Sequence, residues 1–92
     1  MSRKQTARQP DAVVYCGPTV RGVAKQFAVY QNGVPMHLRA LGEKIPEVRA
    51  LTVPLDKFAE TRQALQNGDS TQSLLYARIY RELRRMGINK ED

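Results

Sequence analysis

The chain has 92 residues, with 15 Lys and Arg against 9 Asp and Glu, one His, one Cys and no Trp. This length fits one domain with a modest core, which excludes a multidomain enzyme. A single cysteine excludes a disulfide scaffold within the chain, and one Cys with one His cannot build the usual Cys/His metal sites. We therefore expect no metal and no cofactor. We also expect no membrane segment, because no run approaches the ~18 apolar residues that a span requires.

The formal net charge of +6 is concentrated at the two ends of the chain. Residues 1–10 carry Arg3, Lys4 and Arg8 with no acid. Their polar composition offers nothing to bury, so they predict a disordered basic tail and not a signal peptide. Residues 11–69 hold seven bases and six acids and are almost neutral. We expect a single domain over residues 11–88 and a frayed C-terminus over residues 89–92.

Two short strands are predicted in the first third of the chain. Residues 12–16 are β-branched or aromatic and stop at Gly17-Pro18, and their apolar character on both faces favours a central strand. A loop follows over residues 17–23. Residues 25–31 predict the second strand, with Phe27 and Val29 on one face, and this strand ends at an Asn32-Gly33 turn.

A helix and a third strand are predicted next. Pro35 suits the first turn of a helix over residues 36–44, and Leu38, Leu41 and Ile45 recur on one face of it. Pro46 closes this helix. Residues 48–53 then predict a buried strand that ends before Pro54.

Two further helices are predicted towards the C-terminus. The first begins at Leu55-Asp56 with Asp56 as N-cap, turns Phe58 and Leu65 inward, and ends at Asn67-Gly68. The second begins at Asp69, Ser70 or Thr71 and ends at Gly87. Its apolar stripe consists of Leu75, Ile79, Leu83 and Met86, widened by Tyr76 and Tyr80. The order of elements, ββαβαα, predicts an α+β fold with a small three-stranded sheet and about three helices.

Nothing in the sequence predicts a catalytic site. Nucleophilic catalysis needs a base beside the nucleophile, and Cys16 and His37 are the only candidates. Cys16 lies in a predicted strand, where a small buried hydrophobic role is expected, and His37 lies at a helix start, where a neutral surface role is expected. The expected protein is therefore not an enzyme, and no small-molecule substrate is implied.

The loop from Gly17 to Gly22 is a candidate contact site. Its two glycines bracket a spacing reminiscent of phosphate-binding loops, but Val23 and Ala24 stand where such a loop has Lys and Ser or Thr. Turn geometry is therefore the expected reason for the glycines. Arg21 and Lys25 still make this loop a candidate interaction surface.

The last helix carries the strongest nucleic-acid feature in the sequence. Arg78, Arg81 and Arg85 recur at spacings of three and four on the face opposite the apolar stripe, with Arg84 nearby. Such spacing can neutralise successive phosphates. Glu82 lies beside the arginines, and Tyr76 and Tyr80 are expected on the inner side. A solvated polar face is thus the competing interpretation of the same residues.

The order of residues 13–80 resembles small uncharacterised proteins encoded by bacteriophages and prophages near head and tail genes. The matching segments are Val14-Tyr15-Cys16-Gly17-Pro18, Tyr30-Gln31-Asn32-Gly33-Val34-Pro35, Val53-Pro54-Leu55 and the Ser/Leu/Tyr-rich helix after Gly68. This resemblance implies an accessory or virion-assembly role through protein–protein contacts or self-association, in the bacterial cytoplasm or in a virion. The alternative is a small basic nucleic-acid-binding protein that uses the N-terminal tail, Arg21, Lys25 and the last-helix arginines.

Overall fold

The β-branched and aromatic run near the N-terminus forms the central strand of a three-stranded antiparallel sheet. This strand, β2 (Val13–Tyr15), lies between β3 (Ala28–Tyr30) and β4 (Thr52–Pro54) in the computed structural model, which describes residues 12–88. The register places Val14 opposite Val29 on one side and Val53 on the other. The predicted central strand and the α+β class are confirmed.

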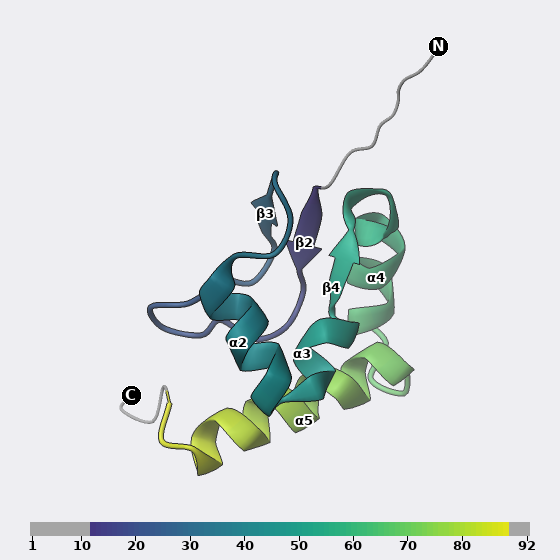
Figure 1. The fold of residues 1–92 in the computed structure, drawn as a ribbon. Coiled ribbons are helices and arrows are strands. Elements are labelled where there is room, and N and C mark those ends of the chain that lie inside the picture. The colour runs from purple at the N-terminus through teal and green to yellow at the C-terminus, as the bar shows by residue number, and fades with distance from the viewer. Residues whose placement is uncertain (1–11, 89–92) are drawn as a thin grey trace.

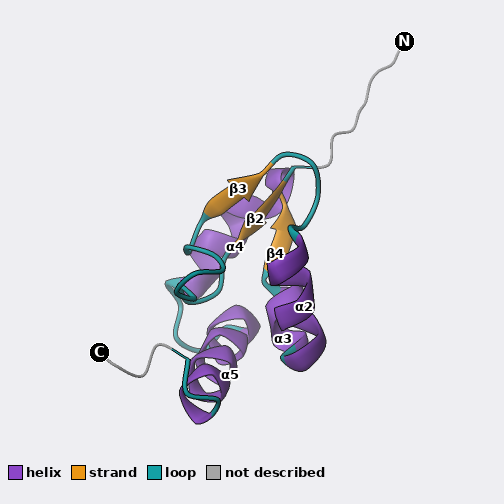
Figure 2. Ribbon diagram, turned by 60° about the vertical axis from the view of Figure 1, so that its left-hand side comes forward, coloured by secondary structure: helices purple, strands orange, loops and turns teal. Residues whose placement is uncertain are grey.

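Four α-helices surround the sheet. They are α2 (Met36–Lys44), α3 (Pro46–Ala50), α4 (Phe58–Leu65) and α5 (Thr71–Arg85), and a 3₁₀ turn, η1 (Leu55–Lys57), precedes α4. Figure 2 shows α4 on one side of the sheet and α2 and α3 on the other. The last helix, α5, lies across one end of this arrangement and packs against both α3 and α4 (Figure 1).

The core is centred on the end of β2. Tyr15 and Cys16 are both 0% exposed, and the Tyr15 hydroxyl donates a hydrogen bond to the Pro18 carbonyl at 2.7 Å. The Tyr15 ring occupies the space beside Gly17, where an added Cβ would come within 2.6 Å of the hydroxyl oxygen. Gly17 is therefore required, because any side chain at this position would collide with the Tyr15 ring.

The predicted third strand over residues 48–53 is wrong in its first half. Residues 46–50 form α3, and only Thr52–Pro54 is a strand. Pro46 ends α2, but its fixed φ also suits the first position of a new helix. The Thr52 hydroxyl donates to the Val48 carbonyl at 2.8 Å and thereby satisfies a group at the end of that helix. The described part of the chain thus has four α-helices and not about three.

The second strand is shorter than the predicted 25–31, because Phe27 has a φ of 68°. This left-handed conformation is rare for a bulky residue and interrupts the strand alternation. Two contacts hold it: the Phe27 N–H donates to the Tyr15 carbonyl at 2.6 Å, and its ring packs edge-on against Phe58 with centroids 5.4 Å apart. Regular strand pairing therefore begins at Ala28.

The helix ends agree with the sequence for α2 and α5 but not for α4, which begins at Phe58 and ends at Leu65, before the predicted stop at Asn67-Gly68. The bounds of α2 are those predicted, with Pro35 immediately before it. Ser70 is the N-cap of α5 and accepts a hydrogen bond from the Ser73 N–H at 3.0 Å, and Gly87 ends that helix with a φ of 83°. Asp56 is not an N-cap: it lies in η1, and no side chain of the described residues caps α4.

Candidate functional site

The amphipathic pattern of α5 gives the helix one buried face and one charged face. Ile79 and Leu83 are 0% and 1% exposed and belong to the core. The outer side exposes four arginines, namely Arg78, Arg81, Arg84 and Arg85. We call these four side chains the α5 basic face. A helix turns about 100° per residue, which places Arg78 and Arg85 on one flank of this face, Arg84 on the other and Arg81 between them.

Two of these arginines are engaged in ion pairs. Arg78 Nη1 lies 3.5 Å from Glu47 Oε2 of α3, and Arg85 Nη2 lies 2.6 Å from Glu82 Oε1. The hydrogen bond from Arg85 lowers the pKa of Glu82. Within residues 12–88, by contrast, Arg81 and Arg84 contact no carboxylate. The half of the α5 basic face that carries these two arginines is therefore free to neutralise an external anion.

Tyr80 lies beside this unpaired half, which corrects its predicted place in the apolar stripe. It is 52% exposed, and the Arg84 guanidinium carbon lies 5.9 Å from the centroid of its ring. Helical geometry agrees with the outcome: Tyr76 is only about 20° around the axis from Leu83 and packs on the core, whereas Tyr80 is about 60° from Leu83, towards the exposed side. Met86, predicted in the same stripe, is also 37% exposed.

A polar cleft of about 350 Å³ borders the opposite flank of the α5 basic face. It lies where the end of α2 and the start of α3 meet α5, and Lys44, Glu47, Arg78, Arg81 and Glu82 line it together with Ile45 and Pro46. Lys44 was missed by sequence reasoning, because a lysine in the last turn of a helix is an ordinary complement to the helix dipole. Only the packing of α3 on α5 brings it to Arg81.

The loop with the two glycines is a tight turn, as predicted. Val20 and Ala24 exchange backbone hydrogen bonds of 2.7 and 3.0 Å, and Gly22 takes a φ of 79° between them. No helix begins at this loop. Arg21 and Lys25 border a shallow hollow of about 560 Å³ beside Ala28 and Tyr30 of β3. The structure thus brings the two predicted contact residues to one surface.

The candidate nucleophile is buried and the candidate base is not. Cys16 is 0% exposed, its thiol approaches the Val14 carbonyl at 3.8 Å, and burial raises its pKa to about 11. His37 is exposed on α2. The predicted buried role of Cys16 is confirmed. Residues 12–88 contain no group of three or more His, Cys, Asp or Glu that could hold a metal ion, and none of their helices has the length and apolar content to span a membrane.

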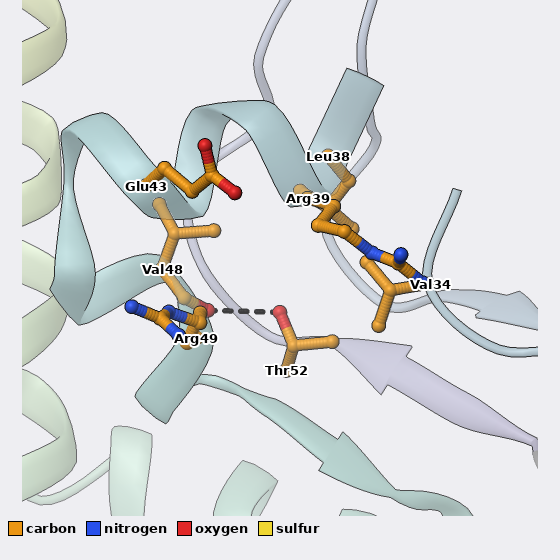
Figure 3. A pocket seen from close by; sticks show the side chains of 7 residues that line it. All are labelled: Val34, Leu38, Arg39, Glu43, Val48, Arg49 and Thr52. Atoms are coloured by element: carbon orange, nitrogen blue, oxygen red, sulfur yellow. Dashed lines mark hydrogen bonds between the residues drawn. The ribbon is translucent and has the colours of Figure 1, made fainter. Parts of the chain in front are cut away.

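A second hollow, of about 380 Å³, lies between α2, α3 and β4 (Figure 3). Val34, Leu38 and Val48 line its apolar part, and Arg39, Glu43, Arg49 and Thr52 complete it. Gly42 gives Arg49 room, since an added Cβ would come within 2.8 Å of the Arg49 Cγ. Figure 3 shows the Glu43 carboxylate and the Arg39 guanidinium on different sides of the hollow. Rim charges of both signs favour no single class of ligand.

The tail residues Arg3, Lys4 and Arg8 lie outside the described residues. No protein-family model matches the sequence, and no curated protein or solved structure is significantly similar to the chain. The resemblance to phage-encoded proteins therefore stays a prediction.

Proposed function

We propose that the protein binds nucleic acid through the α5 basic face. The observation that carries the proposal is the state of Arg81 and Arg84, which are exposed and contact no carboxylate of the described residues. A guanidinium presents several N–H donors in a plane and matches the geometry of a phosphate. Two such groups one turn apart on a rigid helix are suited to neighbouring phosphates of one backbone.

The neighbouring elements strengthen this charge. Lys44 reaches the same surface through the cleft beside Arg81, and Glu82 already has its charge matched by Arg85. The exposed surface of α4, for comparison, carries Glu60 and Arg62 with opposite signs. Among the described helices, α5 has the largest excess of basic over acidic residues, with four arginines and one glutamate, as expected for the electrostatic footprint of a nucleic-acid-binding protein.

Binding should be measured by fluorescence anisotropy with a labelled oligonucleotide over a series of salt concentrations. The Arg81→Ala/Arg84→Ala variant should bind about tenfold or more weakly at low salt, and its salt dependence should be shallower by about 1.4 in log–log slope, for two lost phosphate contacts on a single strand. The matched control is Arg39→Ala/Arg62→Ala, which removes the same charge from exposed sites on α2 and α4.

The control separates a specific surface from general attraction. At about 0.15 M salt we expect the Arg39→Ala/Arg62→Ala variant to bind within about twofold of the unmodified protein, because attraction between exposed charges farther apart than the Debye length of about 8 Å is then largely screened. Equal losses in both double variants would contradict the proposal, since they would show dependence on net charge alone. No binding by the unmodified protein at micromolar concentration and low salt would also overturn it.

A second candidate function is a protein-contact module of the kind that the phage resemblance implies. It is favoured by the edge of β3. The Cys16 N–H donates to the Leu51 carbonyl and the Leu55 N–H to the Ala12 carbonyl, so by alternation the backbone of Val14 also faces β4. The backbone of Val29, opposite Val14, then points away from β2, and Val29 is 47% exposed. An edge of this kind can pair with another strand.

Self-association through this edge is tested by multi-angle light scattering. A dimer that dissociates in the Val29→Lys variant would support the protein-contact function, because a charged side chain on an edge strand disfavours edge-to-edge pairing. A monomer at all concentrations, with unchanged mass in the variant, would remove self-association through β3. A role in virion assembly would then need a different partner protein.

A further inference from the structure

We propose that the α5 basic face is built for single-stranded nucleic acid, with Tyr80 as the residue on which an unpaired base stacks. This inference rests on the proposed function and specifies its substrate class. It starts from the exposure of Tyr80, which remains 52% exposed although Arg84 lies against its ring. A half-exposed aromatic ring beside unpaired arginines is the combination that single-strand-binding surfaces use.

The arrangement along α5 places base and backbone contacts side by side. Tyr80 and Arg84 are one turn apart and in contact, and Arg81 follows Tyr80 towards the centre of the exposed face. Arg81 also borders the cleft that holds Lys44. A single nucleic-acid strand that crosses α5 can therefore place its phosphates against Arg81 and Lys44 while one of its bases stacks on Tyr80.

The acid of α5 lies on the other flank. Glu82 is hydrogen-bonded to Arg85, at 2.6 and 3.1 Å from two of its nitrogens. Helical geometry puts Glu82 about 160° around the axis from Tyr80. Glu82 thus lies on the cleft side of Arg81, together with Glu47, and Tyr80 and Arg84 lie on the side of α5 away from it.

A duplex disfavours this use of Tyr80. Its base faces are stacked on one another, so an aromatic side chain reaches them only by unstacking a base step, whereas the bases of a single strand are accessible. Arginine contacts to phosphates, in contrast, are available in both forms. The structure therefore assigns the preference for single strands to Tyr80 and the salt-dependent affinity to the arginines.

The test compares three labelled probes of equal length: an oligothymidine, the same sugar–phosphate strand without bases, and a duplex. The unmodified protein should bind the oligothymidine about fivefold or more tightly than the abasic strand. Tyr80→Leu should remove this difference and leave binding of the abasic strand unchanged. Tyr80→Phe should keep it, because the ring is retained.

The matched control is Leu74→Ala, which truncates another exposed apolar side chain on the outer side of α5, 61% exposed, without removing a ring. It should bind all three probes as the unmodified protein does. Equal, salt-dependent binding of the oligothymidine and the abasic strand by the unmodified protein would overturn this inference and leave the proposed function standing. Absence of binding to all three probes would overturn both.

Discussion

The strand β2 and the helix α5 both contribute side chains to the core, but they differ in how much of their surface stays exposed. β2 is flanked on both edges by β3 and β4, and its Tyr15 has no exposed surface. α5 lies across the end of the fold (Figure 1) and packs on α3 and α4. Its Tyr80 is 52% exposed. The two tyrosines have the same chemistry, so burial decides which one can meet a partner.

The two regions therefore differ in what their polar groups can do. Two reactive groups at the end of β2, the phenol of Tyr15 and the thiol of Cys16 directly after the strand, are buried in the core, and burial raises their pKa values. The charged groups of α5 add little to stability, because exposed ion pairs contribute roughly 0–1 kcal/mol. They are available for binding instead.

The largest expected effect separates the two faces of α5. Ile79→Ala should lower the free energy of unfolding by about 2–5 kcal/mol, because it opens a cavity in the core. Arg81→Ala should change it by no more than about 0.5 kcal/mol. Urea denaturation measures both. An Arg81→Ala variant as unstable as Ile79→Ala would show that the outer face supports the fold, and the contrast with β2 would fail.

The second effect concerns the thiol of Cys16, which directly follows β2. Its pKa of about 11 in the folded protein exceeds the ordinary value of 9.0, so the unfolded chain ionises first as the pH rises. The stabilisation is fully present below pH 9.0 and is lost as the pH passes about 11. We expect the free energy of unfolding to fall by about 2 kcal/mol over this pH range in the unmodified protein and by less in Cys16→Ala. A smaller fall remains in the variant, because burial also raises the pKa of Tyr15.

Urea unfolding at neutral and alkaline pH, for the unmodified chain and Cys16→Ala, measures this loss. A thiol reagent provides an independent check at neutral pH: Cys16 should react only after denaturant is added. Rapid reaction of the native protein would mean that the end of β2 opens readily, and the assignment of β2 to packing would be wrong.

The third effect compares the two tyrosines directly. Tyr15→Phe removes the hydrogen bond to the Pro18 carbonyl and should cost about 1–2 kcal/mol of unfolding free energy. Tyr80→Phe, at an exposed site, should stay within about 0.5 kcal/mol. Thermal or urea unfolding of both variants checks the pair, and equal costs would contradict the difference in burial between them.

The smallest expected effect comes from a substitution that changes the net charge of α5. Glu82→Gln releases Arg85 from its ion pair and should raise affinity for an oligonucleotide about twofold to threefold at low salt, with no gain at high salt. Stability should stay unchanged within the error of a urea denaturation curve, because the pair is exposed. Weaker binding by this variant would indicate that the pair positions Arg85 for the ligand.

The comparison also shows which local features were readable in the sequence. Ser70 and Gly87 bound α5 because a hydroxyl cap and a positive φ are local requirements. The bounds of α2 followed in the same way from Pro35 and from the spacing of Leu38 and Leu41. In contrast, the left-handed conformation of Phe27 places it outside the regular strand. Its ring packs against Phe58, which is far away in the sequence, so this feature was not readable from local patterns.

The sequence by itself determined the α+β class, the central position of β2, the burial of Cys16 and the exposure of the α5 arginines. Each depends on composition or on periodicity within one element. Only the tertiary structure decided that residues 46–50 form a helix, that Lys44 lines the same cleft as Arg81, and that Tyr80 lies outside the core. The physical reason is that these outcomes depend on which elements cover one another. A helix pattern shows that one side is buried, but the neighbours set how wide that side is.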